Sequence, residues 1–152
     1  MKKRTKKYNP RAIKPHSFLD AIHLSQPVST HAKKTLELGI RSALKAFTDR
    51  VATRQHYNTL ASTIDLCLIA SENLFHDAYQ NELYAARAAM LRTSDRFSRT
   101  KKLGLDGQGL AEIKQAIAIH NELLNNVTGA EVLSMMKARQ AQFNSGAERI
   151  SA

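Results

Sequence analysis

The sequence predicts an all-α, single-domain bundle of four to five helices, preceded by a flexible basic N-terminal arm. A length of 152 residues supports one hydrophobic core. From Val28 to Leu103 the chain has no proline and a single glycine, Gly39, which favours helix. Aromatic residues make up only 6% of the chain, which disfavours a turn-rich β fold. We therefore divide the chain into an arm (1–15), a helical domain (16–143) and a polar C-terminal tail (144–152).

The first long helix is predicted to begin at Ser29 or Thr30, because both residues are good N-caps. A shorter helix over 17–24 is expected before it, ended by Pro27. We attribute Gly39 to a close helix crossing, since glycine inside a helix costs about 1 kcal/mol relative to alanine. The apolar stripe of this helix comprises Leu36, Ile40, Ala43, Leu44, Phe47 and Val51.

The second helix is predicted from Arg54 to about Phe75, with Thr53 as its N-cap. Its apolar residues spread over more than one face, which is typical of a helix surrounded by others. We expect it to be the central helix. The residues predicted to be buried here are Leu60, Ile64, Leu68 and, as a small buried hydrophobe, Cys67.

A third helix is predicted to start within about four residues of Asp77, which forms a possible capping box with Gln80. Its inward residues are Leu83, Ala86, Met90 and Phe97. We expect it to end near Lys101, with Gly104 as the C-cap glycine.

Two further helices are expected after the glycine-rich loop of residues 104–109. The fourth begins at Leu110, and its apolar stripe comprises Ile113, Ala116, Ile117, His120 and Leu124. Thr128 and Glu131 form a second possible capping box. The fifth helix, Ala130 to about Phe143, is either separate or a kinked continuation of the fourth.

The formal net charge of +10 is concentrated in two segments. Residues 1–14 carry seven cations and no acid, and residues 87–102 carry six cations and one acid. Such patches attract polyanions by counterion release and long-range steering. The candidate binding residues are Lys2, Lys3, Arg4, Lys6, Lys7, Tyr8, Arg11, Lys14, Arg87, Arg92, Arg96, Arg99, Lys101 and Lys102.

No catalytic, metal or cofactor site is predicted. The six histidines lack the close spacing of metal ligands on a helix, and the pair Glu72 and His76 is read as a surface or capping contact. His120 is expected to be a core histidine bonded to a neighbour. The glycines at 104, 107 and 109 lack the order of a phosphate-binding loop. We therefore expect a protein that is not an enzyme.

The cellular setting is expected to be the cytoplasm of a bacterial host. The longest apolar run, residues 66–70, is far shorter than the roughly 20 residues needed to span a bilayer. Lys14, His16 and Asp20 interrupt any apolar core of a signal peptide. The single cysteine fits a reducing compartment. No membrane partner is expected, and the oligomeric state stays open.

Several segments carry a resemblance. They are the basic opening Lys2-Lys3-Arg4-Thr5-Lys6-Lys7-Tyr8-Asn9-Pro10, then Ala52-Thr53-Arg54, Ala85-Ala86-Arg87-Ala88-Ala89 and Ala116-Ile117-Ala118-Ile119-His120-Asn121. In this order the chain resembles a family of small uncharacterised basic helical proteins encoded by phages and prophages. The resemblance implies a mobile-element origin and no catalytic residues.

The charge pattern predicts a non-enzymatic accessory or regulatory protein of phage type that engages DNA or RNA through phosphate contacts. Residues 54–68 lack the sharp glycine-containing turn of a helix-turn-helix, so base-specific readout is not expected. The alternative is an inhibitor that binds a host protein machine, such as a nucleic-acid-guided (CRISPR-type) defence complex.

Overall fold

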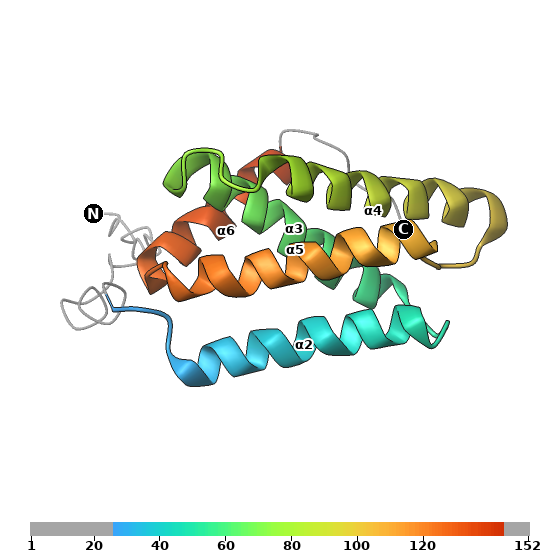
Figure 1. Cartoon of the computed structure of the whole chain (residues 1–152), viewed down its shortest axis with the longest axis horizontal. Helices are drawn as coiled ribbons and strands as arrows, with labels where there is room; N and C mark the ends of the chain where they lie inside the picture. Colours follow the sequence, from blue (N-terminus) through green and yellow to red (C-terminus); the bar gives the residue numbers. More distant parts are fainter. Residues whose placement is uncertain (1–25, 145–152) are drawn as a thin grey trace, which may run out of the picture.

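A computed structural model describes residues 26–144, which form a single all-α bundle (Figure 1). The helices are α2 (Thr30–Thr48), α3 (Arg54–Leu74), α4 (Gln80–Thr100), α5 (Gly107–Asn125) and α6 (Gly129–Asn144). Within this range there is no strand, only an isolated bridge between Pro27 and Thr128. The predicted all-α bundle is confirmed. The predicted arm, the short helix over 17–24 and the tail beyond residue 144 lie outside the described residues.

Local capping chemistry fixes where most of these helices begin. The Ser29 hydroxyl accepts a hydrogen bond from the Ala32 amide at 3.2 Å, at the predicted start of α2. Thr53 precedes α3, and its amide donates to the His56 ring at 3.1 Å. The predicted capping box of α6 forms, because Glu131 accepts from the Thr128 amide at 2.7 Å and its own amide donates back to the Thr128 hydroxyl. These starts are confirmed, and α6 is a helix separate from α5.

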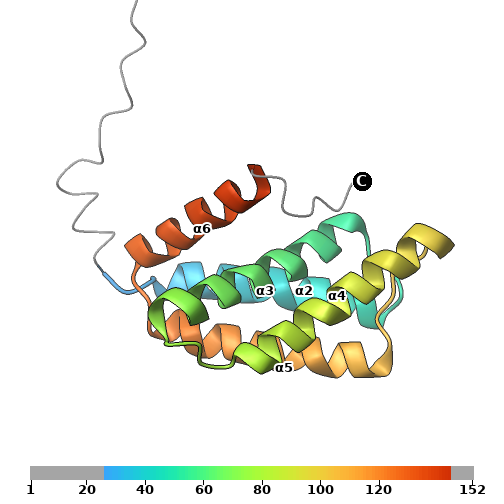
Figure 2. The ribbon, with the colours of Figure 1, turned by 90° about the horizontal axis from the view of Figure 1, so that it is seen from above.

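The central position of α3 is also confirmed. It contacts α2, α4, α5 and α6, and Figure 2 shows α6 on the side of α3 opposite to α5. Leu60, Ile64 and Leu68 are buried, as predicted. Cys67 is buried too, and burial raises the pKa of its thiol to about 12, which keeps the thiol protonated. Among the described helices, none is long and apolar enough to cross a bilayer.

The apolar face of α2 is narrower than its sequence predicts. Leu36 is 44% exposed, and Val51, which lies beyond the end of the helix, is 65% exposed. The reason is that α2 packs mainly on α3 and only slightly on α5, so one stripe centred on Ile40, Ala43 and Phe47 is enough to cover the contact.

The buried face of α5 is rotated slightly from its predicted position. Ile117, His120 and Leu124 are half-buried, whereas Ile119 and Leu123 are buried. The reason is that α5 packs on both α3 and α4. The face that carries Ile113 and Ala116 points between these two helices.

The glycine that permits a close helix approach is Gly109, and the prediction for Gly39 is wrong. Gly39 is exposed, and a Cβ added there would meet nothing within 4 Å. Gly109 is buried, and a Cβ there would lie 2.9 Å from Asp106 Oδ1 and 3.3 Å from the Ala89 Cβ on α4. The first turn of α5 therefore approaches α4 through a position that has no side chain.

Three helix ends differ from their predictions. α4 begins within the predicted interval, but Asp77 has a φ of 63° and does not cap the helix, whose N-cap is Tyr79. At its other end Lys101 takes the left-handed C-cap conformation expected of Gly104. α5 begins three residues before Leu110, because Asp106 caps it and the intervening glycines enter its first turn.

We predict that Ile64→Ala lowers the free energy of unfolding by about 2 to 5 kcal/mol, because Ile64 is 2% exposed and truncation leaves a cavity between α3 and its neighbours. Leu38→Ala, at a position 70% exposed on α2, is the matched control and should change it by less than about 0.5 kcal/mol. Urea denaturation followed by circular dichroism measures both. A similar small loss in both variants would contradict the central position of α3.

Candidate nucleic-acid interface

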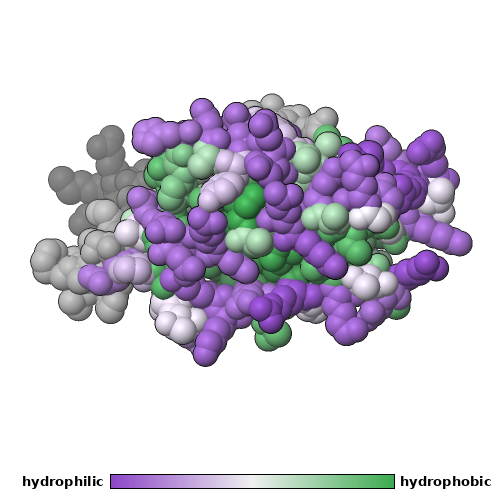
Figure 3. Space-filling view, viewed as in Figure 1, coloured by the Kyte–Doolittle hydropathy of each residue, from purple (hydrophilic) through white to green (hydrophobic). Residues whose placement is uncertain are grey.

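Cations from segments distant in the sequence gather at one end of the bundle. α3 and α4 run antiparallel, so the start of α3 lies beside the end of α4 (Figures 1 and 2). The Arg54 guanidinium lies 5.7 Å from the centroid of the Phe97 ring, which fixes this pairing at the level of side chains. Figure 3 shows hydrophilic side chains covering this end of α4. We call this surface the cationic end and define it by Arg50, Arg54, Arg99, Lys101 and Lys102.

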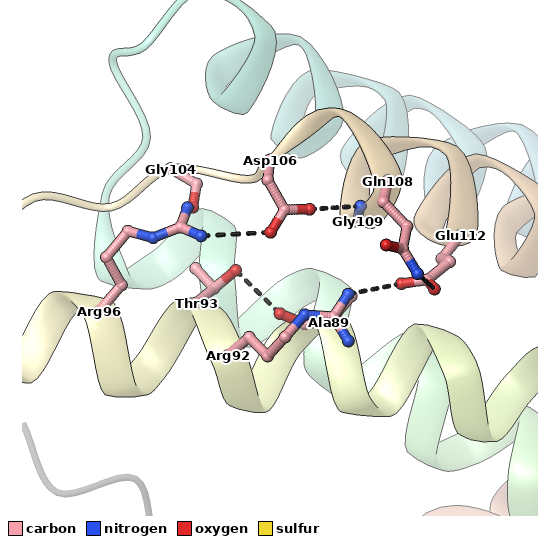
Figure 4. A network of polar contacts seen from close by, with 9 residues as sticks. All are labelled: Ala89, Arg92, Thr93, Arg96, Gly104, Asp106, Gln108, Gly109 and Glu112. Carbon is pink, nitrogen blue, oxygen red and sulfur yellow. Dashed lines mark hydrogen bonds and ion pairs between the residues drawn. The ribbon is translucent and has the colours of Figure 1, made fainter.

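Two further arginines of α4 turn toward α5 and form a polar network with it (Figure 4). Arg92 pairs with Glu112 at 2.8 Å, and Glu112 also accepts from the Gln108 amide group at 2.9 Å. Arg96 donates to the Gly104 carbonyl at 3.1 Å and to the Asp106 carboxylate at 3.2 Å. Both guanidinium charges therefore have a carboxylate partner within the bundle.

Asp106 joins this network to the backbone of α5. Its second carboxylate oxygen accepts from the Gly109 amide at 2.6 Å, which caps the helix. This bond, followed by the bond from Arg96, lowers the pKa of Asp106 below its ordinary value, although partial desolvation opposes the shift. Asp106 thus stays charged at neutral pH and ties the end of α4, the loop and the start of α5 together.

Within the described part of the chain, four charges of the cationic end lack such a carboxylate partner. Arg50, Arg99, Lys101 and Lys102 are exposed, and among residues 26–144 no acidic side chain forms an ion pair with any of them. Their arrangement presents unneutralised positive charge to solvent from the α2–α3 loop and from the end of α4. This suits an anionic ligand.

Arg87 lies about one third of the way along α4, near the contact between α3 and α6. Its charge acts on Asp65, which pairs with Arg139 of α6 at 3.5 Å. Burial raises the pKa of Asp65, and this outweighs the opposite effect of Arg139 and Arg87. Arg87 is therefore placed beside the attachment of α6, away from the cationic end.

Of the residues read as structural in sequence, Glu72 and His120 have side-chain partners, and the partner of Glu72 is Tyr84 rather than His76. Glu72 accepts from the Tyr84 hydroxyl at 3.3 Å, and the exposed His76 lies past the end of α3. His120 lies 3.2 Å from the Asn121 side chain, and its burial lowers the pKa of the imidazole. In the described part of the chain no group of three or more potential ligands could hold a metal ion.

The structure brings together only part of the predicted set. Arg99, Lys101 and Lys102 lie together at the end of α4. Arg92 and Arg96 lie earlier on α4 and belong to the network with α5. Arg87 lies apart, near Asp65. Sequence reasoning missed Arg50 and Arg54. An antiparallel pairing of the second and third predicted helices would have placed them at the same end. The remaining predicted residues lie outside the described range: Lys2, Lys3, Arg4, Lys6, Lys7, Tyr8, Arg11 and Lys14.

Comparison with known proteins gives no match to this chain among family models, curated proteins or solved structures.

We predict that Asp106→Ala lowers the free energy of unfolding by about 0.5 to 2 kcal/mol, because it removes the N-cap of α5 and the carboxylate partner of Arg96. Asp95→Ala removes an exposed carboxylate from α4 at the same end of the bundle and is the matched control. Thermal and urea unfolding measure the difference. Equal stability of the two variants would mean that the network does not hold the helices together.

We also predict that stability falls as the pH is lowered from about 7.5 to about 5, in part through His120. The folded pKa of His120 lies below its ordinary value, so its contribution is present above the unfolded pKa and is lost as the pH falls through the folded pKa. His120→Gln should flatten this dependence, whereas His31→Gln, on the exposed face of α2, should not. Urea midpoints across this range provide the measurement, and identical slopes for the two variants would contradict it.

Proposed function

We propose that this chain is a non-enzymatic accessory or regulatory protein, of phage type, that binds nucleic acid through phosphate contacts. The observation that carries the proposal is the gathering at one end of the bundle of exposed cations that have no acidic partner within residues 26–144. Phosphate oxygens are the natural partners of such exposed guanidinium and ammonium groups. Binding is expected to depend strongly on salt and little on sequence.

The arginines of α4 have two different roles in this proposal, because some of them already have carboxylate partners. Arg92 and Arg96 already have carboxylate partners, so a phosphate would have to compete with Glu112 and Asp106 for them. Arg99, Lys101 and Lys102 need no such exchange. We therefore assign phosphate contact to the cationic end, and assign Arg92 and Arg96 to holding it in place.

The basic arm adds a second source of positive charge in this proposal. Residues 1–14 carry seven cations and no acid. In this proposal they contact phosphates of the same ligand as the cationic end.

We predict that the triple variant Arg99→Gln, Lys101→Gln and Lys102→Gln flattens the dependence of log affinity on log salt by about 2 to 3 for duplex DNA, since each lost phosphate contact removes about 0.9. The matched control removes the same charge elsewhere, by Lys33→Gln, Lys34→Gln and Lys137→Gln on α2 and α6. Fluorescence anisotropy at several salt concentrations measures both slopes.

The control should keep nearly the wild-type slope, and equal flattening in both variants would assign binding to net charge alone. Deleting residues 1–14 should flatten the slope further if the arm contributes. Affinity capture from host lysate, with and without nuclease, tests the other function class. Nuclease-resistant recovery of one host protein, together with no saturable binding of DNA or RNA, would replace this proposal with that of an inhibitor of a host protein machine.

A further inference from the structure

We infer that the cationic end binds double-helical nucleic acid in preference to single strands. This inference rests on the proposed function and names its ligand class. Two features carry it: the separation of exposed aromatic rings from exposed cations, and the rigid backbone that presents the cations. Both are visible in the way α4 is held by its neighbours.

Single-stranded nucleic acid is bound by stacking bases on aromatic rings within the same basic groove that contacts the phosphates. Here the two kinds of group lie at opposite ends of α4. Tyr79 and Tyr84 are 37% and 43% exposed at its start, and Arg99 lies at its end. The 15 residues from Tyr84 to Arg99 correspond to about 22 Å along the helix axis. A base stacked on a tyrosine would therefore leave its own phosphate far from the cations.

The surroundings of these tyrosines also oppose a nucleic-acid strand. The Tyr79 hydroxyl donates to Glu122 at 2.7 Å, and the Tyr84 hydroxyl donates to Glu72 at 3.3 Å. Glu82 lies in the first turn of the same helix. These carboxylates would repel the phosphates of a strand laid across the rings.

The aromatic ring that Arg54 of the cationic end contacts is already covered. Phe97 is half-buried, and the Arg54 guanidinium lies over its ring. The ring is thus engaged by a cation of the protein, which leaves this surface to contact the ligand with charged groups. Among residues 26–144, this surface offers charge without an exposed stacking ring, which favours the ligand with the higher phosphate density, the duplex.

The lysines at this end are presented by a fixed segment of backbone. The Lys101 amide donates to the Phe97 carbonyl at 2.8 Å, and the Lys102 amide donates to the Thr100 hydroxyl at 3.3 Å. A few residues after the lysines, the Gly104 carbonyl and the Asp106 carboxylate both accept hydrogen bonds from Arg96 (Figure 4). A duplex is itself stiff, so two rigid surfaces meet with little loss of conformational freedom, whereas a single strand must be ordered on binding.

The test compares 20-residue probes of one sequence, as DNA duplex, RNA duplex and the corresponding single strands, against the full-length chain. If about five phosphates are contacted and both ligands bind equally at about 1 M salt, slopes of about −0.9 and about −0.7 per phosphate give affinities that differ by about tenfold at about 0.1 M salt. We expect each duplex to bind about tenfold more tightly than its own strands. The tighter of the two duplexes identifies DNA or RNA as the ligand.

Tyr8 lies outside the described residues, so the comparison is repeated with Tyr8→Ser, and the ratio measured in that variant decides. Single strands bound as tightly as the duplexes, or more tightly, would overturn the inference while leaving the proposed function intact. Absence of saturable binding to every probe would instead overturn the proposed function.

Asp106→Ala tests the role of the rigid backbone, because charge and rigidity predict opposite results. The substitution removes one negative charge, so electrostatics alone predicts tighter binding to every probe. Loss of the Arg96 contact should instead lower the duplex-to-strand ratio several-fold. Circular dichroism confirms that the variant is folded at the assay temperature. Tighter binding with an unchanged or higher ratio would show that rigid presentation contributes nothing.

Discussion

The contact of Arg96 with both the Gly104 carbonyl and the Asp106 carboxylate is the interaction on which the cationic end depends. It closes the loop between α4 and α5 from one side, and the Gly109 amide holds Asp106 from the other. Arg96, Asp106 and the Gly109 amide thus bond to one another across α4, the loop and α5. These bonds hold the glycine-rich loop of residues 104–109 in one conformation. Lys101 and Lys102 stand between the end of α4 and this loop, and their amides donate to the Phe97 carbonyl and the Thr100 hydroxyl.

Local chemistry made the helix starts at Ser29, Thr53 and Thr128 predictable. An N-cap needs only a side-chain oxygen and a backbone amide two or three residues on, so the sequence contains everything the interaction requires. The central position of α3 was predictable for a related reason, since apolar residues on more than one face must be covered on more than one side. Asp77 shows the limit, because left-handed residues continue as far as Tyr79 and the helix begins only at Gln80, beyond the reach of the predicted cap.

The tertiary features were beyond the same reasoning. Gly109, and not Gly39, permits the close approach, because that role depends on Ala89 lying across the contact. Arg50 and Arg54 join the cationic end only because α3 and α4 are antiparallel. Leu36 remains exposed because α2 sits at the edge of the bundle, where few neighbours can cover its second row of apolar residues.

The difference between formal and available charge has the widest consequence for function. The sequence assigns α4 and its end one continuous patch, but the partners of each cation decide what a ligand can use. Glu112 pairs with Arg92 and Asp106 pairs with Arg96, so these two guanidinium groups form contacts within the bundle. The charge of Arg87 acts on Asp65. Within residues 26–144, the cations of the cationic end left without an acidic partner or a ring contact are Arg50, Arg99, Lys101 and Lys102. The last two precede the loop that Arg96 and Asp106 hold. If this surface binds phosphates as proposed, it offers fewer contacts in fixed positions, and fixed positions are what can distinguish a stiff duplex from a flexible strand.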